Sequence, residues 1–263
     1  MKLNIVPARA GLQWVKLGLL TFSKQPLALA GLFFMYMTAA TLLSLLPVVG
    51  LVLALAIVPA ATLGLMAATQ EALKGRFPMP AVLISAFRAG RQRLRAMVVL
   101  GLLYAAACMA VMAVVSAIVD VPQTPTQASA EAMMTPRFQL ALLLGSVLYL
   151  PVSLMFWHAP ALVHWHGISP VKSLFFSLVA CLRNAKALLV FGLAWTVVIF
   201  AVSLLIGVVA VMTGNPQVAA TALMPLGLLV TAMFSTSLYF TFRDSFVAPP
   251  EPEPEPPTPG ERP

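Results

Sequence analysis

The sequence predicts an all-α polytopic membrane protein with six transmembrane helices. The chain of 263 residues is 60% hydrophobic and only 9% charged, whereas a soluble domain typically carries about a quarter charged residues. Six apolar windows contain no Asp, Glu, Lys or Arg, and each reaches the roughly 20 residues that cross a bilayer. All but one of the sixteen Lys and Arg residues fall in segments that can lie on one side of these windows. These patterns together predict one oriented helical membrane domain.

The predicted spans follow one another in three parts of the chain. We expect a cytoplasmic amphipathic segment over residues 1–26, a transmembrane domain over residues 27–242 and a disordered Pro/Glu-rich cytoplasmic tail over residues 243–263. Little more than Pro47 separates the first two spans, and proline cannot extend the preceding helix, so they should form a tight hairpin. The six windows are Leu27–Leu46, Val48–Thr69, Ala96–Val119, Phe138–Trp157, Leu188–Met212 and Leu223–Phe242.

The basic residues predict the orientation of the bundle. An even number of spans places both ends on one side, and the connections on the other side carry only Arg137. The positive-inside rule therefore predicts that both termini lie in the cytoplasm. The net charge of +8 fits this orientation and attraction to anionic lipid. A nucleic-acid surface would need basic residues interleaved with exposed aromatics on a soluble face, so we expect no nucleic-acid partner.

Three cytoplasmic segments show the pattern of amphipathic helices that lie in the membrane interface. They surround Leu12–Phe22, Ala81–Arg95 and Val171–Lys186, and each leads into a span. In the last segment the apolar face includes Phe175, with Ser177 facing away. The basic residues of the second and third segments are candidates for contact with lipid headgroups. These residues are Arg88, Arg91, Arg93, Arg95, Lys172, Arg183 and Lys186.

The same three segments raise the hypothesis of a threefold repeat, in which each amphipathic helix is followed by a helical hairpin. Gly31, Gly101 and Gly192 hold matching places early in the following span. The alternative is that any amphipathic helix joined to a span looks similar.

The predicted spans contain little that could carry chemistry. None holds a deep charged side chain, and no phosphate-binding loop, acidic cluster or nucleophile with its base is present, so we expect no enzyme and no cofactor. Cys108 and Cys181 lie far apart and should pack as small residues. The histidines share one stretch with two tryptophans, but they lack the spacing and acidic partner of a zinc site. An interfacial belt of amphipathic rings is favoured over a metal site, with members Trp157, His158, His164, Trp165 and His166.

Prolines and small residues shape the predicted helices. Proline bends a helix, and paired interruptions can mark a transporter site, but we favour bends that serve packing. The four prolines within spans are Pro59, Pro151, Pro160 and Pro225. A row of small residues on the second span lets helices approach closely, within one chain or in an oligomer. The row consists of Ala56, Ala60, Gly64 and Ala68.

One segment carries a family resemblance. It runs from Ala159-Pro160-Ala161-Leu162 through Gly167-Ile168-Ser169-Pro170-Val171-Lys172-Ser173-Leu174 to Arg183-Asn184. It is similar to a recurring pattern in uncharacterised bacterial multi-pass inner-membrane proteins, and roughly Pro7 to Phe242 resembles the YciC-like envelope proteins. The resemblance implies six helices, short interfacial helices before spans and an envelope role, and it brings no catalytic residue.

The expected function is therefore that of a non-enzymatic inner-membrane protein of the cell envelope that engages lipids or other proteins. The partners would be membrane lipids, with a second copy or another membrane protein as further alternatives. The alternative function is a carrier or flippase for a small apolar or amphiphilic substrate. That function requires a cavity that reaches the middle of the membrane.

Overall fold

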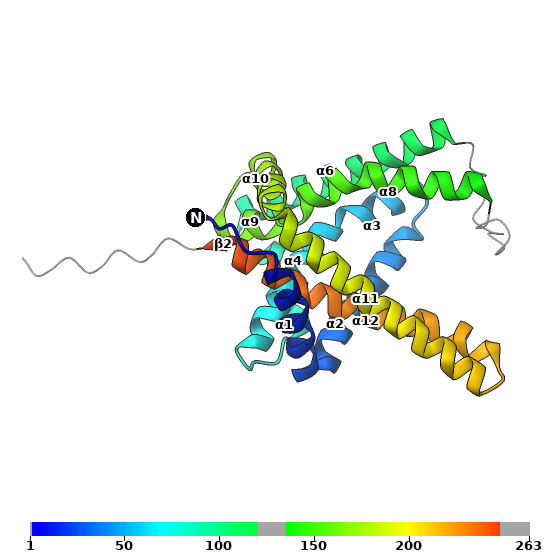
Figure 1. The fold of residues 1–263 in the computed structure, drawn as a ribbon. Helices are drawn as coiled ribbons and strands as arrows, with labels where there is room; N and C mark the ends of the chain where they lie inside the picture. The colour runs from blue at the N-terminus through cyan, green and yellow to red at the C-terminus, as the bar shows by residue number, and fades with distance from the viewer. Residues whose placement is uncertain (1, 120–134, 248–263) are drawn as a thin grey trace, which may run out of the picture.

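The structure, a computed structural model, describes residues 2–119 and 135–247 and is built from α-helices (Figure 1). Six helical segments in this part of the chain are long and apolar enough to cross a membrane, which confirms the predicted all-α polytopic membrane fold. The helices are α1 (Ala10–Lys24), α2 (Pro26–Ser44), α3 (Gly50–Ala56), α4 (Val58–Leu73), the 3₁₀ helix η1 (Pro80–Ile84), α5 (Ser85–Arg88), α6 (Arg91–Ile118), α8 (Pro136–Phe156), α9 (Ala159–His166), α10 (Pro170–Arg183), α11 (Ala185–Met212) and α12 (Pro216–Ser245). The predicted disordered tail lies outside the described residues from position 248 onward.

Proline in the first turn begins several of these helices. It occupies that position in α2, α8, α10 and α12, where its missing N–H and fixed φ favour a helix start. Thr135 and Asn215 complete two of these starts. Their side-chain oxygens accept hydrogen bonds from the backbone N–H groups of Phe138 and Gln217.

Two of the six spans are interrupted. The second span consists of α3 followed by α4, and the fourth consists of α8 followed by α9. Pro59 and Pro160 stand in the first turn of α4 and α9, where each lacks the N–H that would continue the preceding hydrogen-bond ladder. The structure therefore has breaks where the sequence predicts bends. Pro151 and Pro225, by contrast, lie inside continuous helices.

Both ends of the described chain meet at one end of the bundle. Strand β1 (Lys2–Leu3) pairs in antiparallel fashion with β2 (Phe246–Val247), and the N–H of Asn4 donates to the carbonyl oxygen of Ser245. Helices α9 and α10 lie at the same end (Figure 1). We call this end, with β1, β2, α9 and α10, the terminal face. The predicted boundary of the membrane domain at residue 242 lies inside α12, which continues to Ser245.

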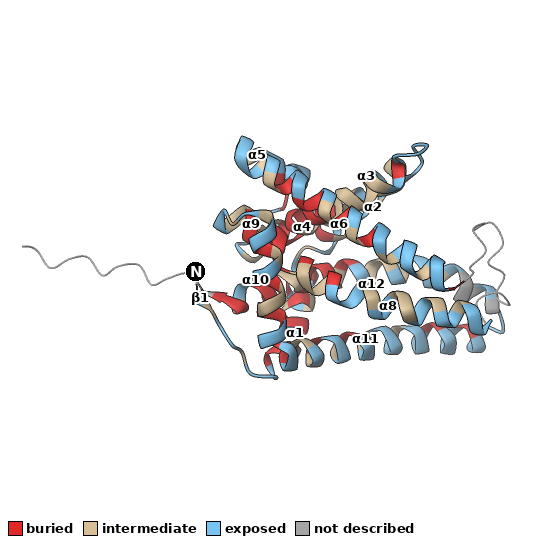
Figure 2. Ribbon diagram, turned by 90° about the horizontal axis from the view of Figure 1, so that it is seen from above, coloured by how far each residue is buried: buried red, intermediate tan, exposed pale blue. Residues whose placement is uncertain are grey.

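Two helical hairpins diverge away from the terminal face: α6 with α8, and α11 with α12 (Figure 1). Burial follows this shape. The buried residues of α6 lie between Met97 and Cys108, and those of α8 are Val152 and Phe156, so none lies in the last turns of α6 or the first turns of α8, farthest from the terminal face. The far halves of α6 and α8 are largely exposed (Figure 2). Lipid chains solvate apolar side chains about as well as a protein interior does, so such halves need no protein cover.

Helix α1 packs directly against α11 and α12. An added Cβ at Gly11 would overlap the carbonyl oxygen of Ala187 in α11, and Gly18 faces α12 just as closely. Trp14 lies between these glycines in the sequence and is completely buried. Leu12, which belongs to the predicted apolar face, is 60% exposed. The packing face of α1 therefore combines small residues and Trp14 with Val15 and Phe22 and excludes Leu12.

The single amphipathic helix predicted over Ala81–Arg95 is not formed. The segment divides into η1, the one-turn helix α5 and the first turn of α6. Gly90 separates α5 from α6 with a φ of 91°, a conformation that glycine adopts far more easily than other residues. Arg91 is therefore the first residue of a spanning helix. The interfacial position of α1 and α10 stays a prediction.

The three glycines that mark the hypothetical repeat have different surroundings. An added Cβ at Gly101 would overlap the carbonyl oxygen of Ala56, whereas at Gly31 or Gly192 it would meet no atom within 4 Å. The threefold repeat thus gains no support from a shared packing role, and it stays a prediction.

Candidate functional site

A cavity lies where the two interrupted spans come together. It is bounded by the start of α4, the end of α8, the middle of α6 and the second half of α12, and its volume is about 290 Å³. We call it the break cavity. Its lining residues are Val58, Pro59, Thr62, Tyr104, Tyr149, Ser153, Phe156, Trp157, Phe234 and Leu238.

Two tyrosine hydroxyls form a hydrogen bond in the break cavity. The hydroxyl oxygens of Tyr104 in α6 and Tyr149 in α8 lie 2.7 Å apart. Tyr104 is 8% exposed and its ring stands edge-on to Phe156, so it forms the inner wall. Tyr149 is 38% exposed and stands on the outer side. Because one hydroxyl donates to the other, the accepting hydroxyl keeps a proton that it can donate to a third group.

The other hydroxyls of the break cavity are already engaged as donors. Thr62 Oγ1 donates to the carbonyl oxygen of Val58 over 2.9 Å, and Ser153 Oγ donates to that of Leu150 over 2.7 Å. None of the lining residues is Asp, Glu, Lys, Arg or His. The cavity therefore suits an uncharged group that can accept a hydrogen bond.

Ser177 of α10 is inserted into the break between α8 and α9. Its hydroxyl donates to the carbonyl oxygen of Leu154 over 2.8 Å and accepts from the backbone N–H of His158 over 2.9 Å. In a continuous helix these two backbone groups would bond to each other. The Cys181 thiol reaches the same Leu154 oxygen over 3.6 Å, and burial raises the pKa of this thiol to about 12. Helix α10 thus stabilises the break beside the cavity, because the Ser177 hydroxyl bonds to both backbone groups that the break separates.

The contact of Ser177 with the break also identifies the face of α10 that packs against the protein. Ser173 and Ser177 are fully buried, whereas Val171, Phe175 and Leu182 are 59% to 70% exposed. The small polar face packs on the bundle, and the break supplies backbone partners for the Ser177 hydroxyl, whereas the Ser173 hydroxyl donates to Pro170 of its own helix. The apolar face points outward and is left available to lipid.

The seven predicted headgroup contacts are all exposed. The acidic residues in the described part of the chain, Glu71 and Asp244, pair with Lys74, Arg76 and Arg243. The candidates therefore have no carboxylate partner among the described residues. They belong to α5, the first turn of α6, α10 and the first turn of α11, and they are Arg88, Arg91, Arg93, Arg95, Lys172, Arg183 and Lys186.

A buried asparagine ties the N-terminal segment to the rest of the terminal face. Asn184, at the start of α11, is 2% exposed. Its Oδ1 accepts from the N–H of Val6 over 2.9 Å, and its Nδ2 donates to the carbonyl oxygen of Asn4 and to Ser245 Oγ. Asn184 ends the segment that carries the family resemblance, but the sequence does not predict its hydrogen bonds, because its partners lie far from it in the chain. A lone polar residue between α10 and the apolar α11 is the one signal that the sequence offers.

The predicted interfacial belt is only partly compatible with the structure. His158 is 1% exposed, and its ring lies against Phe242 and Phe246. It therefore cannot reach headgroups, because the end of α12 and β2 cover it. Trp157 faces the break cavity. The belt stays a prediction for the more exposed residues His164, Trp165 and His166.

The histidines do not form a metal site in the part of the chain that the structure describes. No group of three or more His, Cys, Asp or Glu side chains there could hold an ion. Phe242 packs against the rings of both His158 and His166, with centroids 5.9 Å apart in each case.

The small residues predicted to pack on the second span contact other elements of the same chain. The Ala56 carbonyl lies against Gly101 of α6, and Gly64 faces the backbone of η1. Ala60 and Ala68 are 4% and 0% exposed. This row thus serves packing within one chain.

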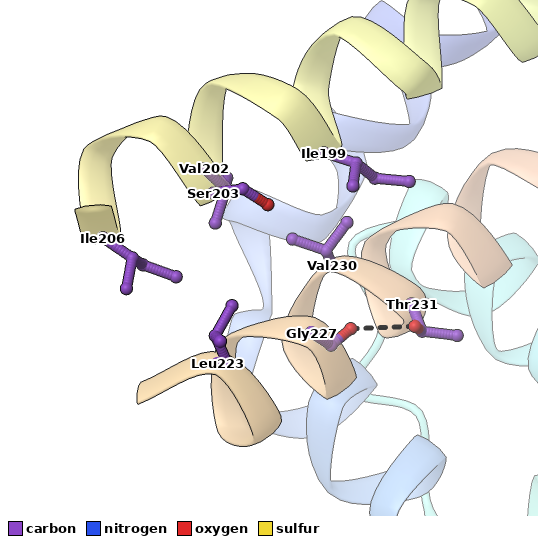
Figure 3. Close-up of a pocket in the computed structure, with 8 residues that line it drawn as sticks. All are labelled: Ile199, Val202, Ser203, Ile206, Leu223, Gly227, Val230 and Thr231. Atoms are coloured by element: carbon purple, nitrogen blue, oxygen red, sulfur yellow. Dashed lines mark hydrogen bonds between the residues drawn. The ribbon is translucent and has the colours of Figure 1, made fainter. Parts of the chain in front are cut away.

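A second cavity, of about 270 Å³, lies between α11 and α12 (Figure 3). Apart from Ser203 and Thr231 its lining is apolar, and Gly227 leaves space because no atom lies within 4 Å of an added Cβ. Thr231 Oγ1 donates to the Gly227 carbonyl oxygen over 2.8 Å. This second cavity lies within the single hairpin of α11 and α12, whereas residues of four helices line the break cavity. We therefore take the break cavity as the candidate site.

Comparison with known proteins finds one informative relative. The chain is 36% identical over 255 residues to the probable inner membrane protein BTH_II0599 of Burkholderia thailandensis, and the match covers 94% of each protein. No family model and no solved structure matches the chain. The similarity extends over nearly the whole chain rather than over one segment.

Proposed function

The chain belongs to the family of that Burkholderia inner membrane protein, and we propose that it acts as a non-enzymatic inner-membrane protein whose exposed basic residues on α5, α6, α10 and α11 engage anionic lipid. The observation that carries this proposal is the set of seven exposed basic residues without a carboxylate partner among the described residues. Lipid phosphates supply the missing negative charge, at about 1 kcal/mol per basic residue near the surface.

The outward face of α10 supports the same proposal. Val171, Phe175 and Leu182 point away from the protein, and Lys172 and Arg183 on the same helix are also exposed. A helix with this pattern places its apolar side chains in the hydrocarbon and its basic side chains at the headgroups.

The orientation that fits this function has both termini in the cytoplasm. The anionic inner leaflet then faces the basic residues. The resemblance to the YciC-like envelope proteins supports an envelope role, and we assign the chain to that group as part of the proposal. Single-cysteine labelling from each side of sealed vesicles tests the orientation. Labelling of residues of the terminal face from the periplasmic side would contradict it.

Lipid retention tests the main proposal. The variant to purify in detergent carries Arg88→Glu, Arg91→Glu, Arg93→Glu and Arg95→Glu. We expect it to retain several-fold less phosphatidylglycerol, relative to phosphatidylethanolamine, than the wild type. Arg137→Glu is the control, because Arg137 lies at the opposite end of the bundle. Unchanged retention together with unchanged topology would refute the lipid proposal and favour a protein partner or a second copy, which crosslinking in the membrane would identify.

The break cavity favours a second candidate function, that of a carrier or flippase for an amphiphilic substrate. Interrupted spans that meet at one cavity are a common feature of transporter sites, and Tyr149 leaves one side of the cavity accessible. Movement of a fluorescent lipid between the leaflets of vesicles that contain the protein would support this candidate. The same rate in protein-free vesicles would reject it.

A further inference from the structure

We propose that the break cavity binds an uncharged membrane amphiphile through a carbonyl oxygen, which accepts a hydrogen bond from the Tyr104–Tyr149 hydroxyl pair. This inference deepens the second candidate function by naming the ligand class. Binding at this site does not itself require transport.

The hydroxyl pair defines the polarity of the ligand. After one tyrosine donates to the other over 2.7 Å, one O–H proton remains, and among the described residues the pair forms no further hydrogen bond to a hydroxyl or backbone oxygen. Tyr104 also makes a side-chain hydrogen bond with the Cys108 thiol, but sulfur is a weak acceptor that a carbonyl oxygen can replace. Because the Thr62 and Ser153 protons are already donated within their own helices, the cavity offers one donor. A ligand group that accepts matches it.

The absence of charge in the lining defines the charge of the ligand. No residue that lines the break cavity is ionisable in the ordinary pH range. An unpaired charge at this depth would lose its hydration without gaining a counter-charge, which costs several kcal/mol. A phosphate is therefore excluded from the cavity itself, and a quaternary amine, although aromatic rings attract it, cannot accept the tyrosine proton. A carbonyl oxygen is neutral and can accept that proton.

The size and walls of the cavity define how much of the ligand enters. A cavity of roughly 150 Å³ is enough for benzene, so about 290 Å³ accommodates one ring or one acyl-glycerol unit but not a whole lipid. Phe156, Trp157 and Phe234 supply aromatic walls. The remaining chain must leave past Tyr149, the exposed member of the pair.

Quenching of Trp157 tests the proposal with the full-length protein in nanodiscs. The probe is a benzoquinone with a decyl tail, which carries ring carbonyls and quenches tryptophan on contact. We expect a saturable component of quenching that is lost in Trp157→Phe. The double variant Tyr104→Phe/Tyr149→Phe keeps both rings and should weaken the apparent affinity by about fivefold, the value of one hydrogen bond, whereas either single variant keeps one hydroxyl that can still donate to the ligand. Tyr239→Phe is the matched control, because Tyr239 does not line the cavity, and it should bind as the wild type does.

Competition between the quinone probe and an ester-containing lipid distinguishes a site for ring carbonyls from a site for ester carbonyls. Dioctanoylglycerol, which carries ester carbonyls, should displace the quinone if the site accepts either source, and failure to displace it assigns the site to ring carbonyls. Ser153→Phe fills the cavity and should abolish saturable quenching. The proposal is overturned if quenching is only linear in probe concentration, or if the Tyr104→Phe/Tyr149→Phe double variant and the Ser153→Phe variant bind like the wild type. Saturable binding without lipid movement would reject the carrier function and retain this site, whereas movement that both variants leave unchanged would reject this site alone.

Discussion

The indole N–H of Trp14 donates a hydrogen bond to the Asp244 carboxylate, with 2.8 Å between Nε1 and Oδ2. The bond joins α1 to the last turn of α12 at the terminal face. Arg243 holds the other carboxylate oxygen over 2.7 Å and also lies over the ring of Phe240, 5.0 Å from its centroid. The first helix of the chain is therefore fastened to the last by a charge-assisted bond as well as by glycine contacts.

Trp14→Phe should lower the free energy of unfolding in detergent micelles by about 1.5–3 kcal/mol. The phenyl ring fills most of the space, but the bond to an ionised acceptor is lost, and such bonds are worth more than neutral ones. Trp195→Phe is a matched control, because Trp195 is also buried and its Nε1 donates to the neutral hydroxyl of Ser237 over 3.2 Å. Equal losses in the two variants would show that the charge of Asp244 contributes nothing.

Ser177→Ala should destabilise the protein by about 2–4 kcal/mol. The substitution leaves two buried backbone groups, the Leu154 carbonyl and the His158 N–H, without the hydroxyl that bridges them. Ser173→Ala is the control, since Ser173 is equally buried but donates only to Pro170 of its own helix. Thermal unfolding in micelles measures both variants, and Ser177→Thr should restore much of the loss. If Ser177→Ala is no worse than Ser173→Ala, the inserted hydroxyl does not stabilise the break.

Cys181 should react slowly with iodoacetamide in the folded protein. Burial raises the pKa of its thiol from 9.0 to about 12, and only the thiolate reacts. In a Cys108→Ala background we expect labelling at pH 8 to be more than about 100-fold slower than after denaturation. Leu182→Cys in a background without both native cysteines is the control, because position 182 is 59% exposed. Comparable rates at the two positions would contradict the burial of Cys181.

The same shift has a consequence for stability against pH. A pKa that is higher in the folded state means that the folded protein binds the thiol proton more tightly than the unfolded chain does. This contribution is complete below about pH 9 and is lost as the pH rises toward 12. Cys181→Ala should therefore flatten the fall in stability over that range, relative to the wild type, in unfolding experiments.

The spans could be predicted from the sequence, but their inner faces could not. Length and the absence of charge identify a span without knowledge of its neighbours, and the even count brings both ends together, as the pairing of β1 with β2 shows. Hydrophobicity does not distinguish a protein-facing from a lipid-facing residue, because both surroundings are apolar. The apolar face predicted for α1 therefore contains both exposed Leu12 and buried Val15 and Phe22, and the sequence does not show which of these residues contact protein.

The candidate site could not be predicted from the sequence for a related reason. The Tyr104–Tyr149 pair, and the bond from Ser177 to Leu154, join residues on different helices, so neither shows a local pattern. The prolines did mark both breaks, yet their positions in the chain did not reveal that the breaks adjoin one cavity. Only the packing of α4, α8 and α12 around α6 brings them together.

Gly101 and Gly192 separate close packing from the hypothetical repeat. An added Cβ at Gly101 would overlap the Ala56 carbonyl oxygen at the end of α3, and backbone cannot move aside easily. We expect Gly101→Ala to lower the free energy of unfolding by about 1–3 kcal/mol, the usual cost of overpacking. Gly192→Ala meets open space and should be neutral or stabilise α11 slightly, since alanine favours helix. Unfolding of both variants in micelles gives the comparison. Similar losses at both positions would instead support an equivalent packing role, as three true repeats require, because Gly192 would then contact a second copy of the chain or another protein.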